Sequence, residues 1–296
     1  MTTTRLKIAF LAAALSLSGC SWLHGTREFE PITLDTTGVS GGVDYSGLDK
    51  VLKAAVNSGG EISPDELMDN TRMLEGQLML LALSGPKTQP ELFEDEPAIL
   101  NYWLNARAAW SLKLMLTFSR EHLKDGDKEI RDSDRWQFGK NGISIEEFSN
   151  RPFPIDGRSM TLGLIDELLT GEFGFRAVAG APCVSPLRAK LPTQPFNTQD
   201  VAALIDKRFG QFVDDSERFA VDIESRRILI PPVLWRFREE IIESHEKKYG
   251  STGADLATAL LPYVQFSPHR RLQDAVGYKC VEASEKKVAL IIKRKD

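Results

Sequence analysis

The sequence feature that most constrains the fold is an apolar stretch from residue 97 to residue 119. Asp95 is placed to cap a helix there, and Pro97 occupies an early helical position where its missing N–H costs nothing. Apolar side chains then fill nearly every angle of the helical wheel. A helix that is apolar all round is buried or spans a membrane. Polar residues interrupt this one too often for a span of about 20 apolar residues, so we predict a buried central helix over 97–119.

Two polar residues inside this helix, Asn105 and Arg107, are predicted to be buried with it. Buried polar side chains need hydrogen-bond partners. The helix therefore specifies a polar feature of the fold as well as its core, although these residues alone name no reaction.

The first twenty residues have the organisation of a bacterial export signal. Arg5 and Lys7 form a positive region, and residues 8–17 form an apolar region of signal-peptide length. The segment ends in Leu17-Ser18-Gly19-Cys20, which resembles the lipobox of bacterial lipoproteins. We therefore predict that residues 1–19 are a lipoprotein signal peptide and that Cys20 carries the lipid, with palmitate among its acyl chains. Small residues directly before Cys20 argue against an ordinary signal peptide with a chance cysteine.

The residues after Cys20 indicate where the protein resides. Ser21 follows the cysteine rather than Asp, and by resemblance to the sorting rule of enteric bacteria this favours the outer membrane, with the protein facing the periplasm. Residues 20–45 are rich in Gly, Thr and Ser and lack periodicity, so we predict a lipidated flexible tether. Residues 46–296 remain as a single globular domain.

Composition limits the class of partner. Removing Arg5 and Lys7 takes the formal charge from −5 to −7. A mildly acidic chain without a basic block is not typical of nucleic-acid-binding proteins. Hydrophobic content of 42% and charged content of 27% are ordinary for a globular protein. The expected partners are the membrane, through the lipid, and an envelope protein or small ligand.

Periodicity and turn residues predict further elements along the domain. The predicted helices share an apolar face and cover residues 46–57, 63–85, 145–148, 160–169, 197–209, 231–250, 254–263 and 268–276. The strand candidates are short runs at residues 136–138, 153–155, 173–179, 218–222, 227–230 and 287–293. Helices dominate and strands are scattered, which predicts an α+β class: a mostly helical single domain around helix 97–119 with a small sheet of short strands.

Several segments in chain order resemble the family called domain of unknown function 547. The segment Tyr102-Trp103-Leu104-Asn105-Ala106 resembles its Phe-Trp-Ile-Asn-Ala signature, and Ile165-Asp166 resembles its Ile-Glu segment. Residues 176–187, ending Ser185-Pro186-Leu187, resemble its His-Phe-Ala…Cys-Pro-Pro-Leu stretch. The resemblance covers residues 94–276 approximately.

The chain also departs from this family at polar positions. Arg107-Ala108 stands where the family has Tyr-Asn, Arg176 stands where it has His, and Gly180-Ala181 falls near its first Cys. Its C-terminal Tyr-Asp-Trp motif is missing. The chain therefore lacks most of the polar residues that would carry chemistry in the family.

Cysteine chemistry is the strongest enzymatic alternative. A cysteine hydrolase needs a thiolate next to a histidine. Cys183 is the candidate nucleophile, and His122, His245 and His269 are the candidate bases, but no histidine stands out by its surroundings. Metal-ligand spacing and a glycine-rich phosphate loop are missing as well, so no catalytic residue, metal or cofactor is predicted.

Two functional hypotheses follow. The preferred one is a non-enzymatic envelope lipoprotein that binds a partner or ligand in a groove near Asn105, Arg107, Arg176 and the 176–187 loop. Arg176, Arg188 and Lys190 are candidates to line an anion-binding cleft, with solvated surface cations as the alternative. The second hypothesis is a divergent papain- or transglutaminase-like cysteine hydrolase or acyl-transfer enzyme.

Two cysteines, Cys183 and Cys280, remain after lipidation of Cys20. Exported bacterial proteins meet an oxidising compartment in which disulfides persist. An even pair in one domain predicts a Cys183–Cys280 disulfide. The alternative of two separate buried thiols stays open, because the sequence does not give their separation.

Overall fold

A buried helix, α4 (Glu96–Glu121), forms the centre of the fold, as the sequence predicts. The structure is a computed structural model that describes residues 43–121, 138, 143–215, 220–264 and 272–284. The helix begins at the predicted cap, since Asp95 Oδ1 accepts the N–H of Ala98 at 2.8 Å. Tyr102 and Trp103 are 0% and 2% exposed. Such a helix can exist only because other parts of the chain cover most of its surface.

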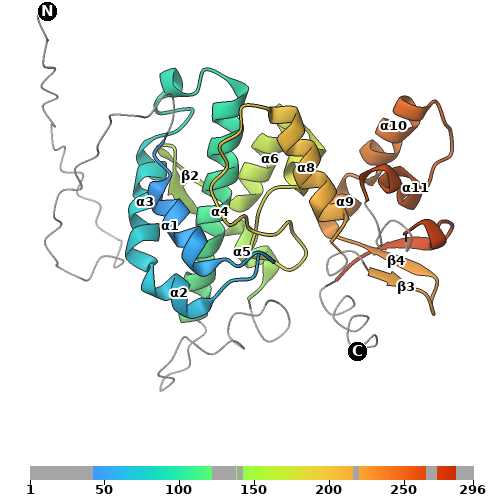
Figure 1. Cartoon of the computed structure of the whole chain (residues 1–296), viewed down its shortest axis with the longest axis horizontal. Helices are drawn as coiled ribbons and strands as arrows, with labels where there is room; N and C mark the ends of the chain where they lie inside the picture. The colour runs from blue at the N-terminus through green and yellow to red at the C-terminus, as the bar shows by residue number, and fades with distance from the viewer. Residues whose placement is uncertain (1–42, 122–137, 139–142, 216–219, 265–271, 285–296) are drawn as a thin grey trace, which may run out of the picture. The chain divides into compact units, whose positions relative to one another are not determined.

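Helices dominate the elements around α4. It packs against α3, α6 and α8, and Figure 1 shows it between α1 and α3 on one side and α6 and α8 on the other. The other helices of the described residues are α1 (Ser46–Ala55), α2 (Pro64–Asp69), α3 (Thr71–Leu83), η1 (Pro90–Leu92), α5 (Ile145–Asn150), α6 (Leu162–Phe173), α7 (Phe175–Ala179), α8 (Val201–Val213), α9 (Pro232–Arg236), α10 (Arg238–Tyr249), α11 (Leu256–Leu260) and η3 (Leu261–Tyr263).

The strands are short and form two small sheets. One is the antiparallel pair β1 (Phe153–Ile155) and β2 (Arg158–Met160). The other has the order β3-β4-β5; its strands are β3 (Ala220–Asp222), β4 (Arg227–Ile230) and β5 (Lys279–Glu282). β3 and β4 lie within the strand candidates 218–222 and 227–230 and pair antiparallel as a hairpin, and β5 is parallel to β4. The described residues belong to one compact unit, so the predicted mostly helical α+β single domain is confirmed.

The β1–β2 hairpin ties the loop before α4 to the core. Its turn is Asp156-Gly157, with φ of +51° and +65°, the left-handed pair that a two-residue hairpin turn requires. The buried Asp156 carboxylate accepts the N–H groups of Lys87 at 3.0 Å and Thr88 at 2.9 Å. The turn therefore connects β1 and β2 and also holds the backbone of the loop before α4 in place.

Two predicted helices are each divided in the structure. The 63–85 segment begins as predicted, with Ser63 accepting the N–H of Glu66, but it breaks at Asn70 into α2 and α3 and ends at Leu83. The 231–250 segment breaks at Phe237 into α9 and α10. At both breaks one residue has backbone angles outside the helical region. The apolar periodicity continues across each break, so the sequence pattern gives no sign of it.

The prediction of a β-like segment over 173–179 is wrong. Phe173 ends α6, Gly174 with φ of +77° separates the helices, and residues 175–179 form α7. A short apolar run has no periodicity that distinguishes a strand from a buried helical turn. The β2 strand is a second difference from the prediction. Met160, the expected first residue of helix 160–169, belongs to β2, and α6 begins only after its cap at Thr161.

Several predictions lie outside the described residues. They are the lipidation site Cys20 and its signal peptide, most of the tether, the 136–137 part of one strand candidate, the 268–271 part of one helix, and the 287–293 strand. Among the residues that the structure does describe, no helix is long and apolar enough to cross a bilayer.

Candidate functional site

The central helix holds an extended segment through two asparagines one turn apart. Asn105 Oδ1 accepts the N–H of Phe196 at 2.7 Å, and its amide donates to Phe196 O at 2.9 Å. Asn101 does the same with Thr198, at 3.0 and 2.9 Å. Residues 196 and 198 lie on one edge of an extended chain, so the two amides pair with it as a neighbouring strand would. They fix the path of the segment that leads into α8.

Tyr45, at the start of the domain, also contacts the Asn105 side chain. Burial raises the pKa of its hydroxyl, and the contact with the Asn105 side chain lowers that pKa by less. Asn105 is 0% exposed. Its predicted burial with a polar partner is confirmed, and its partners are the protein's own backbone and Tyr45.

A second polar cluster surrounds Arg107, which is 3% exposed. Its Nε and Nη2 donate to the two carboxylate oxygens of Asp166 at 2.8 and 3.2 Å, and its Nη1 donates to Pro182 O at 2.5 Å. Arg188 Nη2 donates to the same carboxylate at 3.1 Å and to Val178 O at 3.2 Å. The cluster thereby joins α4, α6 and the loop after α7.

The charges of this cluster compensate one another in part, because two guanidinium groups share one carboxylate. Burial by itself would lower the pKa of Arg107, but the Asp166 carboxylate raises it above the usual arginine range. Burial and the charge of Arg107 lower the pKa of Arg188. Burial acts to raise the pKa of Asp166, but the two guanidinium groups hold it below its usual range. All three groups therefore remain charged near neutral pH.

Cys183 lies inside this cluster, and no histidine of the described residues is paired with it. Its thiol interacts with the Arg107 guanidinium, and it is 3% exposed. His245, the candidate base within the described residues, lies against Tyr249 and makes no hydrogen bond to Cys183. The other candidate bases, His122 and His269, lie outside the described residues.

The predicted Cys183–Cys280 disulfide is not formed in the structure, where both cysteines are free. Cys280 is in β5, with Asp255 and Ala257 as neighbours, whereas Cys183 lies beside Arg107. Burial, followed by the charge of Asp255, raises the pKa of Cys280 to about 11. The alternative of two separate thiols is the one that the structure contains.

The three residues of the predicted groove are not brought together. Asn105 and Arg107 are occupied by buried protein partners, and Arg176 is an exposed side chain paired with Asp206 at the surface. None of the three lines the cavity described next.

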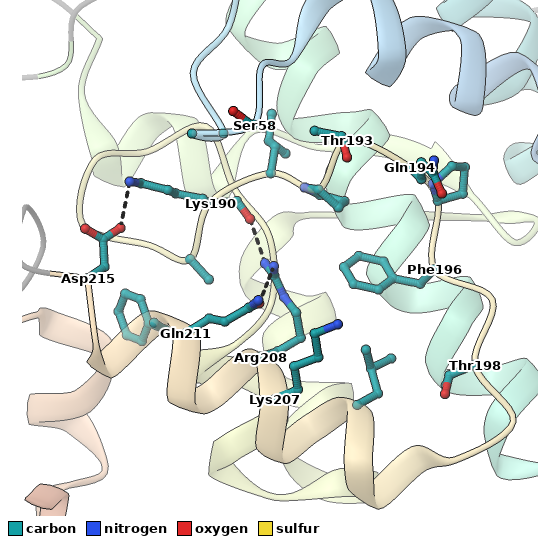
Figure 2. A pocket seen from close by; sticks show the side chains of 18 of the residues that line it. Ser58, Lys190, Thr193, Gln194, Phe196, Thr198, Lys207, Arg208, Gln211 and Asp215 are labelled. Atoms are coloured by element: carbon teal, nitrogen blue, oxygen red, sulfur yellow. Dashed lines mark hydrogen bonds and ion pairs between the residues drawn. The ribbon is translucent and has the colours of Figure 1, made fainter. Parts of the chain in front are cut away.

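A cavity of about 840 Å³ lies beside the segment that the asparagines hold. Its walls come from residues 58–60, residues 189–198 and α8, together with Asp214 and Asp215 after α8 (Figure 2). The asparagine pairs fix one wall at Phe196 and Thr198. The α8 helix forms the opposite wall, and its start is capped by Asp200 Oδ1, which accepts the N–H of Ala203 at 2.9 Å.

Arg208 is the most buried cation on this cavity. It follows Ile205 by three residues and precedes Phe212 by four, so it borders the buried face of α8. Its Nε donates to Gly180 O at 3.1 Å and its Nη2 to Lys190 O at 2.6 Å. Glycine is required at 180, since a Cβ there would lie 2.7 Å from Arg208 Cβ. Burial lowers the pKa of Arg208 to about 10.

The cavity also presents other charges and an aromatic ring. Lys190 Nζ pairs with Asp215 at 3.1 Å at one end. Figure 2 shows Phe196, Lys207 and Thr198 on the other side of Arg208, with Thr193, Gln194 and Ser58 along the rim. The Phe196 ring centroid is 5.4 Å from Arg208 Cζ. Of the predicted cleft cations, Lys190 lines this cavity and Arg188 belongs to the Asp166 cluster.

Sequence reasoning missed Lys207 and Arg208, because a charged pair on an amphipathic helix normally faces solvent. It also missed the 190–198 segment, whose Pro192 and Pro195 are the signals of an extended path. Among the described residues no cluster of His, Cys, Asp and Glu is arranged to hold a metal ion. Comparison of the chain with protein-family models, with curated proteins and with solved structures gives no match.

Proposed function

We propose that the chain is a lipid-anchored envelope protein whose folded domain is a non-enzymatic binding module, with its ligand in the cavity between residues 189–198 and α8. The observation that carries this proposal is the cavity itself. Its volume of about 840 Å³ falls in the range of small-molecule sites. One wall of the cavity, at residues 196–198, is held by hydrogen bonds to the side chains of Asn101 and Asn105 rather than by a neighbouring strand. The backbone of that wall is therefore fixed in position.

The anchor part of the proposal rests on Leu17-Ser18-Gly19-Cys20. A diacylated cysteine supplies the two hydrophobic chains that stable membrane attachment needs. Ser21 supports placement in the outer membrane facing the periplasm. The test is Cys20→Ser: incorporation of a fatty-acid probe is expected to stop, and continued labelling would contradict the anchor.

Membership of the family called domain of unknown function 547 is proposed as a distant relationship. Two of the segments that resemble the family, the central helix and the Ile165-Asp166 segment, meet in the Arg107–Asp166 ion pair. In this chain that meeting point is filled by charge pairs, which supports a binding module rather than an active enzyme.

The cysteine-enzyme alternative is less well supported, because Cys183 is buried against a guanidinium. We expect a chloroacetamide probe to leave Cys183 unlabelled in the folded protein and to label it after unfolding. Rapid labelling of the folded protein, together with a hydrolytic or acyl-transfer turnover that Cys183→Ala abolishes, would favour the enzyme instead.

The binding function is tested with a panel of neutral, basic and acidic small molecules. The protein is the chain from Cys20 onward with Cys20→Ser, produced without lipid, and binding is followed by NMR through its backbone amides. Binders are expected to shift the amide resonances of residues 190–198 and of α8. A panel in which no compound of any charge shifts those resonances would contradict the proposal.

A matched pair of variants locates the site. Thr193→Trp places an indole on the cavity rim, and Thr252→Trp places one on an exposed loop outside the cavity. Thr193→Trp should lower the affinity for the compounds that bind in the panel, and Thr252→Trp should leave that affinity unchanged. Equal effects of the two substitutions would place the binding elsewhere.

A further inference from the structure

The cavity contains a half-buried cation whose partners among the described residues are all neutral. Arg208 donates to two backbone carbonyls, of Gly180 and Lys190, and at 3.4 Å to the Gln211 side chain. It forms no ion pair with a carboxylate of the described residues. Arg107 is the contrast, since its buried guanidinium is matched by both oxygens of Asp166. The charge of Arg208 is left without a counter-charge.

An uncompensated buried charge is costly, and an anion brought to it offsets that cost. A guanidinium has five N–H donors, and the protein takes three from Arg208. Its planar fork is matched to the oxygens of carboxylates and phosphates. Burial lowers the pKa of Arg208 to about 10, so the group is still protonated and able to bind an anion at neutral pH.

The neighbours of Arg208 give this end of the cavity its polarity. Lys207 is exposed, lines the cavity and forms no ion pair with a described residue, and Figure 2 shows its amine extending below the Phe196 ring. Lys190 and Asp215 pair at the other end. The Asp215 carboxylate is therefore separated from the Arg208–Lys207 end, which has cations and an aromatic surface.

We propose that this end binds the carboxylate or phosphate group of an acidic small ligand, with Arg208 and Lys207 contacting the anion and Phe196 packing against the ligand's carbon skeleton. The proposal rests on the cavity being the binding site, and it names the chemical class of the occupant. Thr193 and Gln194 on the rim are exposed and make no hydrogen bond to other described residues, so they are available to the polar part of the same ligand.

The test uses inorganic phosphate and citrate as probes at constant ionic strength, which separates specific binding from charge screening. The protein is again the unlipidated chain from Cys20 onward. Both probes, or one of them, are expected to shift the amide resonances of residues 196–198 and 207–208 in a saturable manner. The relative affinities of phosphate and citrate distinguish a phosphate-bearing ligand from a carboxylate.

Three variants assign the contacts. Lys207→Gln, which removes no described contact, should weaken probe binding roughly threefold to tenfold. Lys247→Gln removes the same charge from the exposed face of α10, outside the cavity, and should leave the affinity unchanged. Arg208→Lys keeps the charge but loses the fork, and it should weaken binding more than Lys207→Gln while the circular dichroism spectrum stays native.

Each contrary result has a distinct meaning. Equal effects of Lys207→Gln and Lys247→Gln, or a folded Arg208→Lys protein that binds the probes normally, would overturn the anion site. Neutral compounds from the panel that bind in the cavity when neither probe does would overturn the anion site and leave the binding function standing. Failure of every compound and both probes would overturn both.

Discussion

Two arginines of this protein, the buried Arg107 and the half-buried Arg208, have different electrostatic surroundings. Arg107 is joined to Asp166, shares it with Arg188 and contacts Pro182 O, so its charge is matched within the core. Arg208 has only neutral partners and borders a cavity of about 840 Å³. The difference indicates that the first arginine serves stability, whereas the charge of the second is available to a molecule from outside.

The largest expected loss of stability follows substitution of Arg107. Arg107→Leu would leave Pro182 O without its donor and Asp166 with one partner instead of two. Breaking a buried ion pair costs about 3–5 kcal/mol, which chemical denaturation would report as a loss of unfolding free energy. Arg151→Gln is the matched control, because Arg151 pairs with Glu121 and Glu147 at the surface and should cost less than about 1 kcal/mol.

A result in which Arg107→Leu and Arg151→Gln cost the same would show that the Asp166 cluster is not a structural centre. The double variant Arg107→Leu with Asp166→Leu sharpens the test. It also leaves Arg188 without its carboxylate, so its unfolding free energy should lie below that of Arg107→Leu alone, in which the Arg188–Asp166 pair remains.

The next effect concerns the wall of the cavity. Asn105→Leu would leave the N–H and carbonyl of Phe196 unpaired in a buried place, at a cost of about 2–3 kcal/mol. The substitution should also lower the affinity for any ligand of the cavity, since Phe196 lines the cavity. Ser111→Ala is the control on the same helix, because Ser111 bonds only to Ala108 O of its own helix and should cost less than about 1 kcal/mol. Unchanged ligand affinity in a folded Asn105→Leu protein would separate the asparagine from the site.

The Asp166 cluster also predicts a dependence on acid. Because Arg107 and Arg188 hold the pKa of Asp166 below its unfolded value of about 4, its stabilising contribution is complete above that unfolded value. The contribution should be lost as the pH falls from there through the lower folded pKa. Asp166→Asn should flatten the dependence of unfolding free energy on pH in that window, measured by urea denaturation. An equally steep dependence in Asp166→Asn would contradict the charge pairing.

The smallest stability effect is expected at Arg208. Arg208→Met removes hydrogen bonds to Gly180 O and Lys190 O, of which only Lys190 borders the cavity, so the cost should be about 1–2 kcal/mol. The same variant should lose the phosphate and citrate binding described above. A loss of stability as large as that of Arg107→Leu would show that Arg208 is structural and would remove the contrast between the two arginines.

The Arg107 region could be predicted from the sequence in large part, and the Arg208 region could not. The polar interruptions of helix 97–119 predict buried partners for Asn105 and Arg107, since a helix covered on all sides leaves them no solvent. The partners themselves are distant: Phe196 lies 91 residues from Asn105 and Asp166 lies 59 residues from Arg107. Local periodicity carries no information on such pairings.

The cavity depends on those distant pairings, which is why it was missed. Residues 190–198 form a wall only because Asn101 and Asn105 hold their backbone. Arg208 is half-buried because the end of α7 approaches α8 closely at Gly180. In the sequence, Lys207 and Arg208 look like any exposed pair on an amphipathic helix, and the 173–179 segment resembles a strand rather than the helix that covers Arg208.

The side-chain Nε–Hε resonances of Arg107, Arg188 and Arg208, followed by NMR in one citrate titration, test the central claim most directly. The account predicts that the Arg208 resonance shifts in a saturable manner while those of Arg107 and Arg188 stay in place, because their charges are already paired with Asp166. An Arg208 resonance that stays in place while cavity amides shift, or an Arg107 resonance that moves as far as that of Arg208, would contradict it.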